Sequence, residues 1–319
     1  MRSYPALVTS LATLLFAAAL STRVAAGDAF ANQRTIRAGE TELRIEVIGI
    51  ADADRIAMLQ RWAEEAARAT VLPSGRFPLR SARVEVREID SSSISAVPWG
   101  QTSRDDDVAV LLYVRRGASD EQLRADWTAV HEFAHLAHPY LGERGRWLAE
   151  GLASYQQNVL RAAAGLLDSE EAWRRLDAGF RRGEAVGGGA TLDAMGRQRD
   201  GTMRVYWAGA AYWLEMDLRL RRDHGTTLDA VLDRYAQCCL DGTAHVAPED
   251  FAAALDHAGG VDVFSLRYRE YAASTEFPSL AETYRALGIE RDGEGLRFSD
   301  DSAAAHALRK AITMRPPQR

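Results

Sequence analysis

Polar and apolar residues alternate in the first third of the chain, whereas the rest has the three- to four-residue spacing of amphipathic helices. Residues 43–47 and 83–89 alternate and predict two strands, and the continuous apolar run at 108–114 predicts a strand covered on one or both faces. Apolar residues at helical spacing predict a helix over 52–70, and 91–107 is predicted to be a loop. These elements form a small α/β unit.

From residue 119 onward the pattern is almost entirely helical. Ser119 and Gln122 have the spacing of a capping box and begin a helix that runs through residue 135 and ends near Pro139. Further helices are predicted over 143–165, from Ser169 onward, and over 202–222, 226–239, 248–258, 261–274 and 278–287. After Gly293 the pattern is weak, with one short alanine-rich helix.

The pattern therefore predicts an α+β fold in four parts. They are a leader at 1–26, a small α/β subdomain at 27–118, a helical subdomain at 119–290 and a weakly structured tail at 291–319. The residues after the leader are numerous enough to bury a sizeable core.

The leader has the features of a secretory signal peptide. Arg2 provides the positive end, an apolar core runs from Leu7 to Leu20, and the small residues at 24–26 fit a cleavage site. The apolar core is short for a membrane span, and an uncleaved anchor is the alternative. We expect an exported protein, periplasmic or secreted, with no stable membrane span after cleavage.

Charge and cysteine content narrow the possible partners. Cleavage would remove two of the 39 basic residues and none of the 45 acidic ones, so the net charge would change from −6 to −8. With no long basic run, nothing suggests nucleic-acid binding.

Cys238 and Cys239 are adjacent, and neighbouring Cα atoms lie about 3.8 Å apart, below the usual disulfide range. We expect two part-buried helical cysteines, with a redox role as the alternative.

Residues 131–135 read His-Glu-Phe-Ala-His, the H-E-x-x-H pattern. On a helix, residues four apart share one face, so His131 and His135 can direct both imidazoles at one metal ion. Neutral imidazole suits zinc, and a catalytic zinc site has three protein ligands plus water. Glu132 is then placed to act as the general base of a metallopeptidase.

Glu150 is the predicted third ligand. It lies in the segment W-L-A-E-G-L-A-S-Y at 147–155, far enough beyond His135 for the chain to turn and bring a second helix alongside. Ser154, one turn later, is predicted to hydrogen-bond the outer nitrogen of a ligating histidine. The alternative for Glu150 is an exposed helix glutamate.

The H-E-x-x-H helix followed by W-L-x-E-G-x-A-S-Y resembles the gluzincin metallopeptidases, which include thermolysin and aminopeptidase N. More specifically, the chain is similar to the catalytic domain of the glycyl aminopeptidase family, with further matches at 162–171 and at Y-W-A-G-A over 206–210. The resemblance implies a zincin fold, in which a zinc cleft lies between a small mixed β-sheet subdomain and a mainly helical subdomain. It also implies one Zn²⁺ per chain and hydrolysis of peptide or protein substrates.

Carried over residue by residue, the resemblance implies that His131, His135 and Glu150 bind zinc and that Glu132 is the catalytic base. Tyr206 matches the tyrosine that stabilises the oxyanion in aminopeptidase relatives, a role suited to a phenol. A packed helix aromatic is the alternative for Tyr206.

Three other histidines have weaker assignments. His224 and His245 are reserve candidates for the oxyanion role, because thermolysin-like enzymes use a downstream histidine there. His138 is expected to be a helix-end histidine beside Pro139, with support of a metal ligand as the alternative.

The sequence departs from the family where substrate binds. Relatives carry a glutamate, in a glycine-rich loop, that binds the free amine of the substrate. This chain has Gly100 and Gln101 there, which remain candidate substrate-binding residues, although Gln101 cannot neutralise an ammonium. The spacing from His135 to Glu150 is also shorter than usual, and the family's large N-terminal β-domain and PDZ domain have no counterpart.

The sequence therefore predicts an exported zinc metallopeptidase, either an endopeptidase or an atypical aminopeptidase. One alternative is an inactive zinc-binding relative that acts as a peptide-binding module. The other is a structural helical protein in which the motif is accidental.

Overall fold

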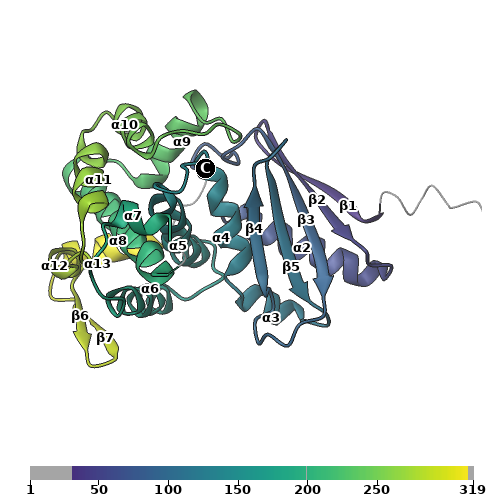
Figure 1. The fold of residues 1–319 in the computed structure, drawn as a ribbon. Helices are drawn as coiled ribbons and strands as arrows, with labels where there is room; N and C mark the ends of the chain where they lie inside the picture. Colours follow the sequence, from purple (N-terminus) through teal and green to yellow (C-terminus); the bar gives the residue numbers. More distant parts are fainter. Residues whose placement is uncertain (1–30, 199, 315–319) are drawn as a thin grey trace, which may run out of the picture.

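The computed structural model describes residues 31–198 and 200–314, so the predicted signal peptide lies outside the described residues. A five-stranded sheet forms one part of the molecule and a group of helices the other (Figure 1). The strands are β1 (Gln33–Ala38), β2 (Thr41–Ile48), β3 (Ser81–Ile89), β4 (Trp99–Ser103) and β5 (Ala109–Arg115). Their order is β1-β2-β3-β5-β4, with parallel pairing in the centre and an antiparallel strand at each edge.

The centre of the sheet forms because its inward residues are apolar and in register. Ile45 pairs with Val84, which pairs with Val110, and all three are fully buried. Helix α2 (Ala53–Arg68) is capped by Asp52 and contributes Trp62 to the same core. The predicted small mixed sheet is thus confirmed.

The helical part follows the sheet in sequence and surrounds two long central helices, α5 and α8 (Figure 1). It contains α3 (Asp120–Ala125), α4 (Thr128–Ala134), the 3₁₀ turn η1 (His135–Ala137), α5 (Arg146–Ala163), α6 (Ser169–Glu184), α7 (Leu192–Gly196), α8 (Thr202–Asp223), α9 (Leu228–Cys238), α10 (Pro248–Gly259), α11 (Val263–Ala273), α12 (Ala281–Leu287) and α13 (Ala303–Thr313). None of the described helices is long and apolar enough to cross a membrane.

Two predicted elements differ in the structure. The predicted loop at 91–107 contains β4, the edge strand antiparallel to β5. The predicted helix from Ser119 is broken into α3 and α4 at Asp126, whose backbone is extended. Its carboxylate accepts hydrogen bonds from Ser95 (2.6 Å), from the Val97 amide (3.0 Å) and from the Thr128 amide at the start of α4 (2.9 Å). These three hydrogen bonds stabilise the extended backbone of Asp126 more than one continuous helix would.

The C-terminal segment is more ordered than predicted. It forms a hairpin of β6 (Ile289–Asp292) and β7 (Gly295–Phe298), followed by α13. Arg309 of α13 is buried and donates to the Leu287 carbonyl at 2.6 Å and the Ser299 carbonyl at 2.9 Å. These bonds fasten the segment to the end of α12.

The two cysteines are joined by a disulfide and both are exposed. The prediction of two part-buried, unbridged helical cysteines is therefore wrong. The reason lies in the end of the helix: α9 stops at Cys238, and Cys239 leaves it with φ −140° and ψ −14°.

Helices α5 and α8 approach each other closely at a pair of glycines. A Cβ atom on Gly209 would overlap the main-chain oxygen of Trp147, and one on Gly151 would overlap the backbone of Gly209. The indole of Trp213 donates to the Leu148 carbonyl at 2.8 Å beside this contact. The absence of side chains therefore sets the distance between the two central helices.

Replacing Gly209 with alanine should destabilise the protein, although alanine favours helix more than glycine does. The clash is with backbone, which cannot rotate away, so we expect a loss of about 3 kcal/mol in the free energy of unfolding. Urea denaturation would measure it. Gly187→Ala is the matched control, because that exposed glycine has open space around it. Equal stability of the two variants would contradict the close contact.

Candidate metal centre

His131, His135 and Glu150 converge at the junction of α4, η1 and α5. The Nε2 atom of His131 lies 3.3 Å from Oε2 of Glu150, and Nε2 of His135 lies 3.7 Å from the same oxygen. All three potential ligand atoms lie within 4.8 Å of one another. Two imidazole nitrogens and one carboxylate oxygen form a donor set that fits zinc.

The helix that carries the motif is buried along its whole length, between β4 and α5 (Figure 1). A polar side chain in such a position is costly unless it is hydrogen-bonded. The partners of the two histidines therefore decide how the site is built.

The hydrogen bonds orient both imidazoles toward the metal position. Nδ1 of His131 lies 2.8 Å from the Gln157 oxygen, which can only accept, so His131 donates from Nδ1 and leaves Nε2 free. Nδ1 of His138 lies 2.6 Å from the Pro139 carbonyl and must likewise donate. Nε2 of His138 then accepts from Nδ1 of His135 at 2.9 Å, which leaves Nε2 of His135 free as well.

These partners differ from those expected. Ser154 is buried on α5, but the outer nitrogens of the ligand histidines contact Gln157 and His138 instead. Gln157, one turn further along α5, has the longer side chain and reaches His131. His138 leaves the 3₁₀ turn with extended backbone, which brings its ring back against His135. The predictions for Ser154 and for His138 as a simple helix-end residue are both wrong.

Electrostatics favour the metal-binding protonation state at His135 and Glu150. At His131, burial lowers the pKa, but the hydrogen bond with Glu150 and the charge of Glu132 outweigh burial and raise it. Burial lowers the pKa of His135 well below its usual value and that of His138 to about 3, so both rings are neutral at neutral pH. Burial opposes ionisation of Glu150, but its hydrogen bond with His131 and its proximity to both histidine rings outweigh burial and lower the pKa of Glu150 to about 2. Glu150 is therefore a carboxylate.

Glu132 lies beneath strand β4. A Cβ atom at Gly100 would come within 2.7 Å of Cγ of Glu132, so the strand can lie this close because residue 100 is glycine. The hydroxyl of Thr102 donates to the Glu132 carboxylate at 3.1 Å and lies 2.9 Å from its main-chain oxygen. Burial raises the pKa of Glu132, which suits a group that must accept a proton.

Tyr206 comes from α8 and completes this side of the site. Its ring is nearly parallel to that of His131, with the centroids 6.0 Å apart, and it lines the same cleft as Glu150. Burial and the charge of Glu150 raise the pKa of Tyr206, so its hydroxyl stays protonated and can donate.

These residues line a cleft of about 290 Å³. Gly100 and Gln101 also line it, as does Arg104, which donates to the main-chain oxygens of His135 (2.5 Å) and His138 (2.9 Å). Neither reserve histidine does. His224 is exposed at the far end of α8 from Tyr206, and His245 packs outside the cleft against Tyr140 and Gly142.

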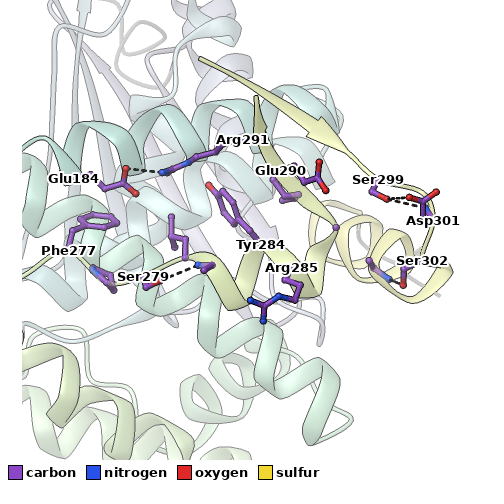
Figure 2. A pocket seen from close by; sticks show the side chains of 16 residues that line it. Glu184, Phe277, Ser279, Tyr284, Arg285, Glu290, Arg291, Ser299, Asp301 and Ser302 are labelled. Carbon is purple, nitrogen blue, oxygen red and sulfur yellow. Dashed lines mark hydrogen bonds and ion pairs between the residues drawn. The ribbon is translucent and has the colours of Figure 1, made fainter. Parts of the chain in front are cut away.

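A larger cavity of about 720 Å³ lies elsewhere, between α12, the β6–β7 hairpin and α13 (Figure 2). Two of the charged side chains that line it, Arg291 and Glu184, pair with each other. Arg291 donates to Glu184 at 2.9 Å and to the buried Asp177 at 2.6 Å. Among the described residues, the metal-ligating group is found in the smaller cleft.

No family model and no curated protein matches the sequence. In contrast, the fold matches solved structures. An aminopeptidase N family protein from Idiomarina loihiensis has a TM-score of 0.57 at 16% identity, over 81% of this chain and 49% of its own. The chain has a gluzincin-like fold. The predicted fold class, with a small mixed sheet and a mainly helical subdomain, is thereby confirmed.

Two further gluzincin-like neighbours match less closely. An M1 zinc metallopeptidase from Deinococcus radiodurans has a TM-score of 0.45 at 17% identity, over 78% of this chain and 52% of its own. Yeast LTA4 hydrolase has a TM-score of 0.46 at 11% identity, over 80% and 42%. This chain therefore spans about half the length of the structures it matches.

We expect the zinc affinity of the site to depend on the hydrogen bond from His135 to His138. His138→Ala removes the acceptor that orients His135, so we expect zinc affinity to fall by about 10- to 100-fold. Competition with a chromophoric zinc chelator would measure the change. His224→Ala, an exposed histidine remote from the cleft, should leave affinity unaltered. Unchanged affinity in His138→Ala would show that the contact does not support the ligand.

Proposed function

We propose that this protein is a zinc-dependent metallopeptidase that hydrolyses peptide bonds. The observation that carries the proposal is the convergence of His131, His135 and Glu150 in one cleft, with Glu132 beside them. The fold shared with an aminopeptidase N family protein supports it. His131, His135 and Glu150 would hold a zinc ion, which would supply Lewis acidity and lower the pKa of a bound water.

The residues around the metal position have complementary roles. Glu132 accepts a proton from the attacking water and passes it to the leaving amine. Thr102 fixes one oxygen of that carboxylate, which limits the directions from which the proton can come. Tyr206 donates a hydrogen bond to the oxygen that gains negative charge as the carbonyl is attacked.

The residues of strand β4 that line the cleft bear on the mode of cleavage. Gln101 is neutral where an aminopeptidase would need an acid to bind the ammonium of its substrate. We therefore propose an endopeptidase or an atypical aminopeptidase. The signal-peptide pattern of residues 1–26 supports export to the periplasm or the medium.

Glu132→Gln should separate metal binding from turnover. The amide keeps the shape of the side chain but cannot accept the proton, so we expect one zinc per chain and a fall of about 10²- to 10⁴-fold in cleavage of a peptide library. Metal content by mass spectrometry and cleavage by peptide mapping would test this. Glu121→Gln, on the exposed face of α3, is the control.

The zinc content and peptide cleavage of the wild-type protein distinguish a peptidase from a peptide-binding module. Zinc without cleavage would favour a peptide-binding module, and absence of zinc would overturn the site assignment. Full activity in Glu132→Gln would exclude Glu132 as the base.

Tyr206→Phe removes one hydroxyl and leaves the packed ring. We expect kcat to fall by about 10²- to 10³-fold with KM and zinc content nearly unchanged, because the lost hydrogen bond forms only as charge develops. Steady-state kinetics on a peptide identified by mapping would measure it. Tyr140→Phe alters a hydroxyl elsewhere in the cleft lining and should retain activity. A normal kcat in Tyr206→Phe would leave Tyr206 with a packing role only.

A further inference from the structure

Arg146 places a positive charge in the cleft, one helical turn before Glu150 on α5. Side chains four apart on a helix lie on one face, with Cβ atoms about 5–6 Å apart. Arg146 lines the same cleft as the proposed ligands and is half-buried. Its guanidinium carbon lies 5.7 Å from the centre of the Tyr206 ring. The cation is therefore adjacent to the position where a peptide would react.

The charge of Arg146 is not neutralised within the described part of the chain. Its Nη1 atom donates to the Gln198 carbonyl at 3.2 Å, and its guanidinium lies near the Tyr206 ring. In contrast, Arg144 pairs with Glu249 at 2.7 Å and Asp193 at 3.6 Å. A guanidinium has five N–H donors, so Arg146 retains donors for a ligand.

The other charged groups of the cleft are engaged or lie at its rim. Arg104 also lines the cleft, where its Nη2 atom donates to the two main-chain oxygens described above. Glu132 and Glu150 belong to the proposed base and metal site, and Glu143 is exposed at the rim. Gln101, which also lines the cleft, is neutral, so the cleft offers a cation to the substrate at Arg146.

We propose that Arg146 binds a carboxylate of the substrate and so sets the specificity of the peptidase proposed above, on which this inference rests. A planar guanidinium pairs with a carboxylate through two parallel hydrogen bonds. An extended peptide advances about 3.3–3.6 Å per residue, so a carboxylate one or two residues from the scissile bond fits a separation of one helical turn. The C-terminal carboxylate and the side chain of Asp or Glu both supply this chemistry.

Matched peptides distinguish these two sources. One pair differs only in a C-terminal acid or amide, and the other carries Glu or Gln next to the cleaved bond, with the C-terminus blocked. We expect the wild type to favour the carboxylate member of one pair by about 10- to 100-fold in kcat/KM. Arg146→Met should abolish that preference, Arg146→Lys should keep part of it, and Arg144→Met should keep it all. The pair that responds identifies the carboxylate.

Two outcomes would overturn the inference. The first is a uniform fall in kcat/KM for all four peptides in Arg146→Met, which would mean that Arg146 acts through Tyr206 alone. The second is a preference for the carboxylate peptides that survives in both Arg146 variants. Zinc content and circular dichroism would show whether each variant is folded.

A binding measurement separates this inference from the peptidase proposal. The four peptides are titrated by calorimetry into zinc-loaded Glu132→Gln and into the same protein carrying Arg146→Met. Carboxylate-dependent binding that Arg146→Met removes, without cleavage by the wild type, would refute the peptidase and keep the inference. Cleavage by the wild type with no carboxylate preference would refute the inference alone, and absence of binding and cleavage would refute both.

Discussion

The direct contact of α5 and α8 is the constraint on which the cleft depends. Glu150 precedes the glycine of α5 at this contact, and Tyr206 lies almost one turn before the glycine of α8. Because the backbones touch there, the carboxylate and the phenol are brought together by main-chain geometry. Long flexible side chains are not needed for that purpose. The same contact places Arg146 beside Tyr206.

A second constraint is the burial of α4. A helix without an exposed face ordinarily carries only apolar residues, yet this one carries two ionisable groups of the site and His135 follows it. Their desolvation is offset by three hydrogen-bonding partners: Gln157 on α5 for His131, His138 after η1 for His135, and Thr102 near the end of β4 for Glu132. A bound cation would add to this compensation, so folding and metal binding are thermodynamically linked.

The sequence was informative where geometry is local. The spacing of His131 and His135 fixes their common face within one helical turn, and the alternation at 43–47 and 83–89 fixes which strand residues are buried. It was uninformative where distant contacts decide. Strand β4 is short, polar and at an edge, so it has no clear period. Asp126 breaks a helix because Ser95 and Val97 donate to it, and Gln157 replaces Ser154 because of side-chain reach.

The proposed metal ligands all belong to the helical part, whereas the strand that covers Glu132 belongs to the sheet. The strand residues that line the cleft and the proposed ligand set therefore come from separate parts of the chain. Substitutions at Gly100 or Gln101 would alter the lining of the cleft and leave the three proposed ligands on the helices unchanged.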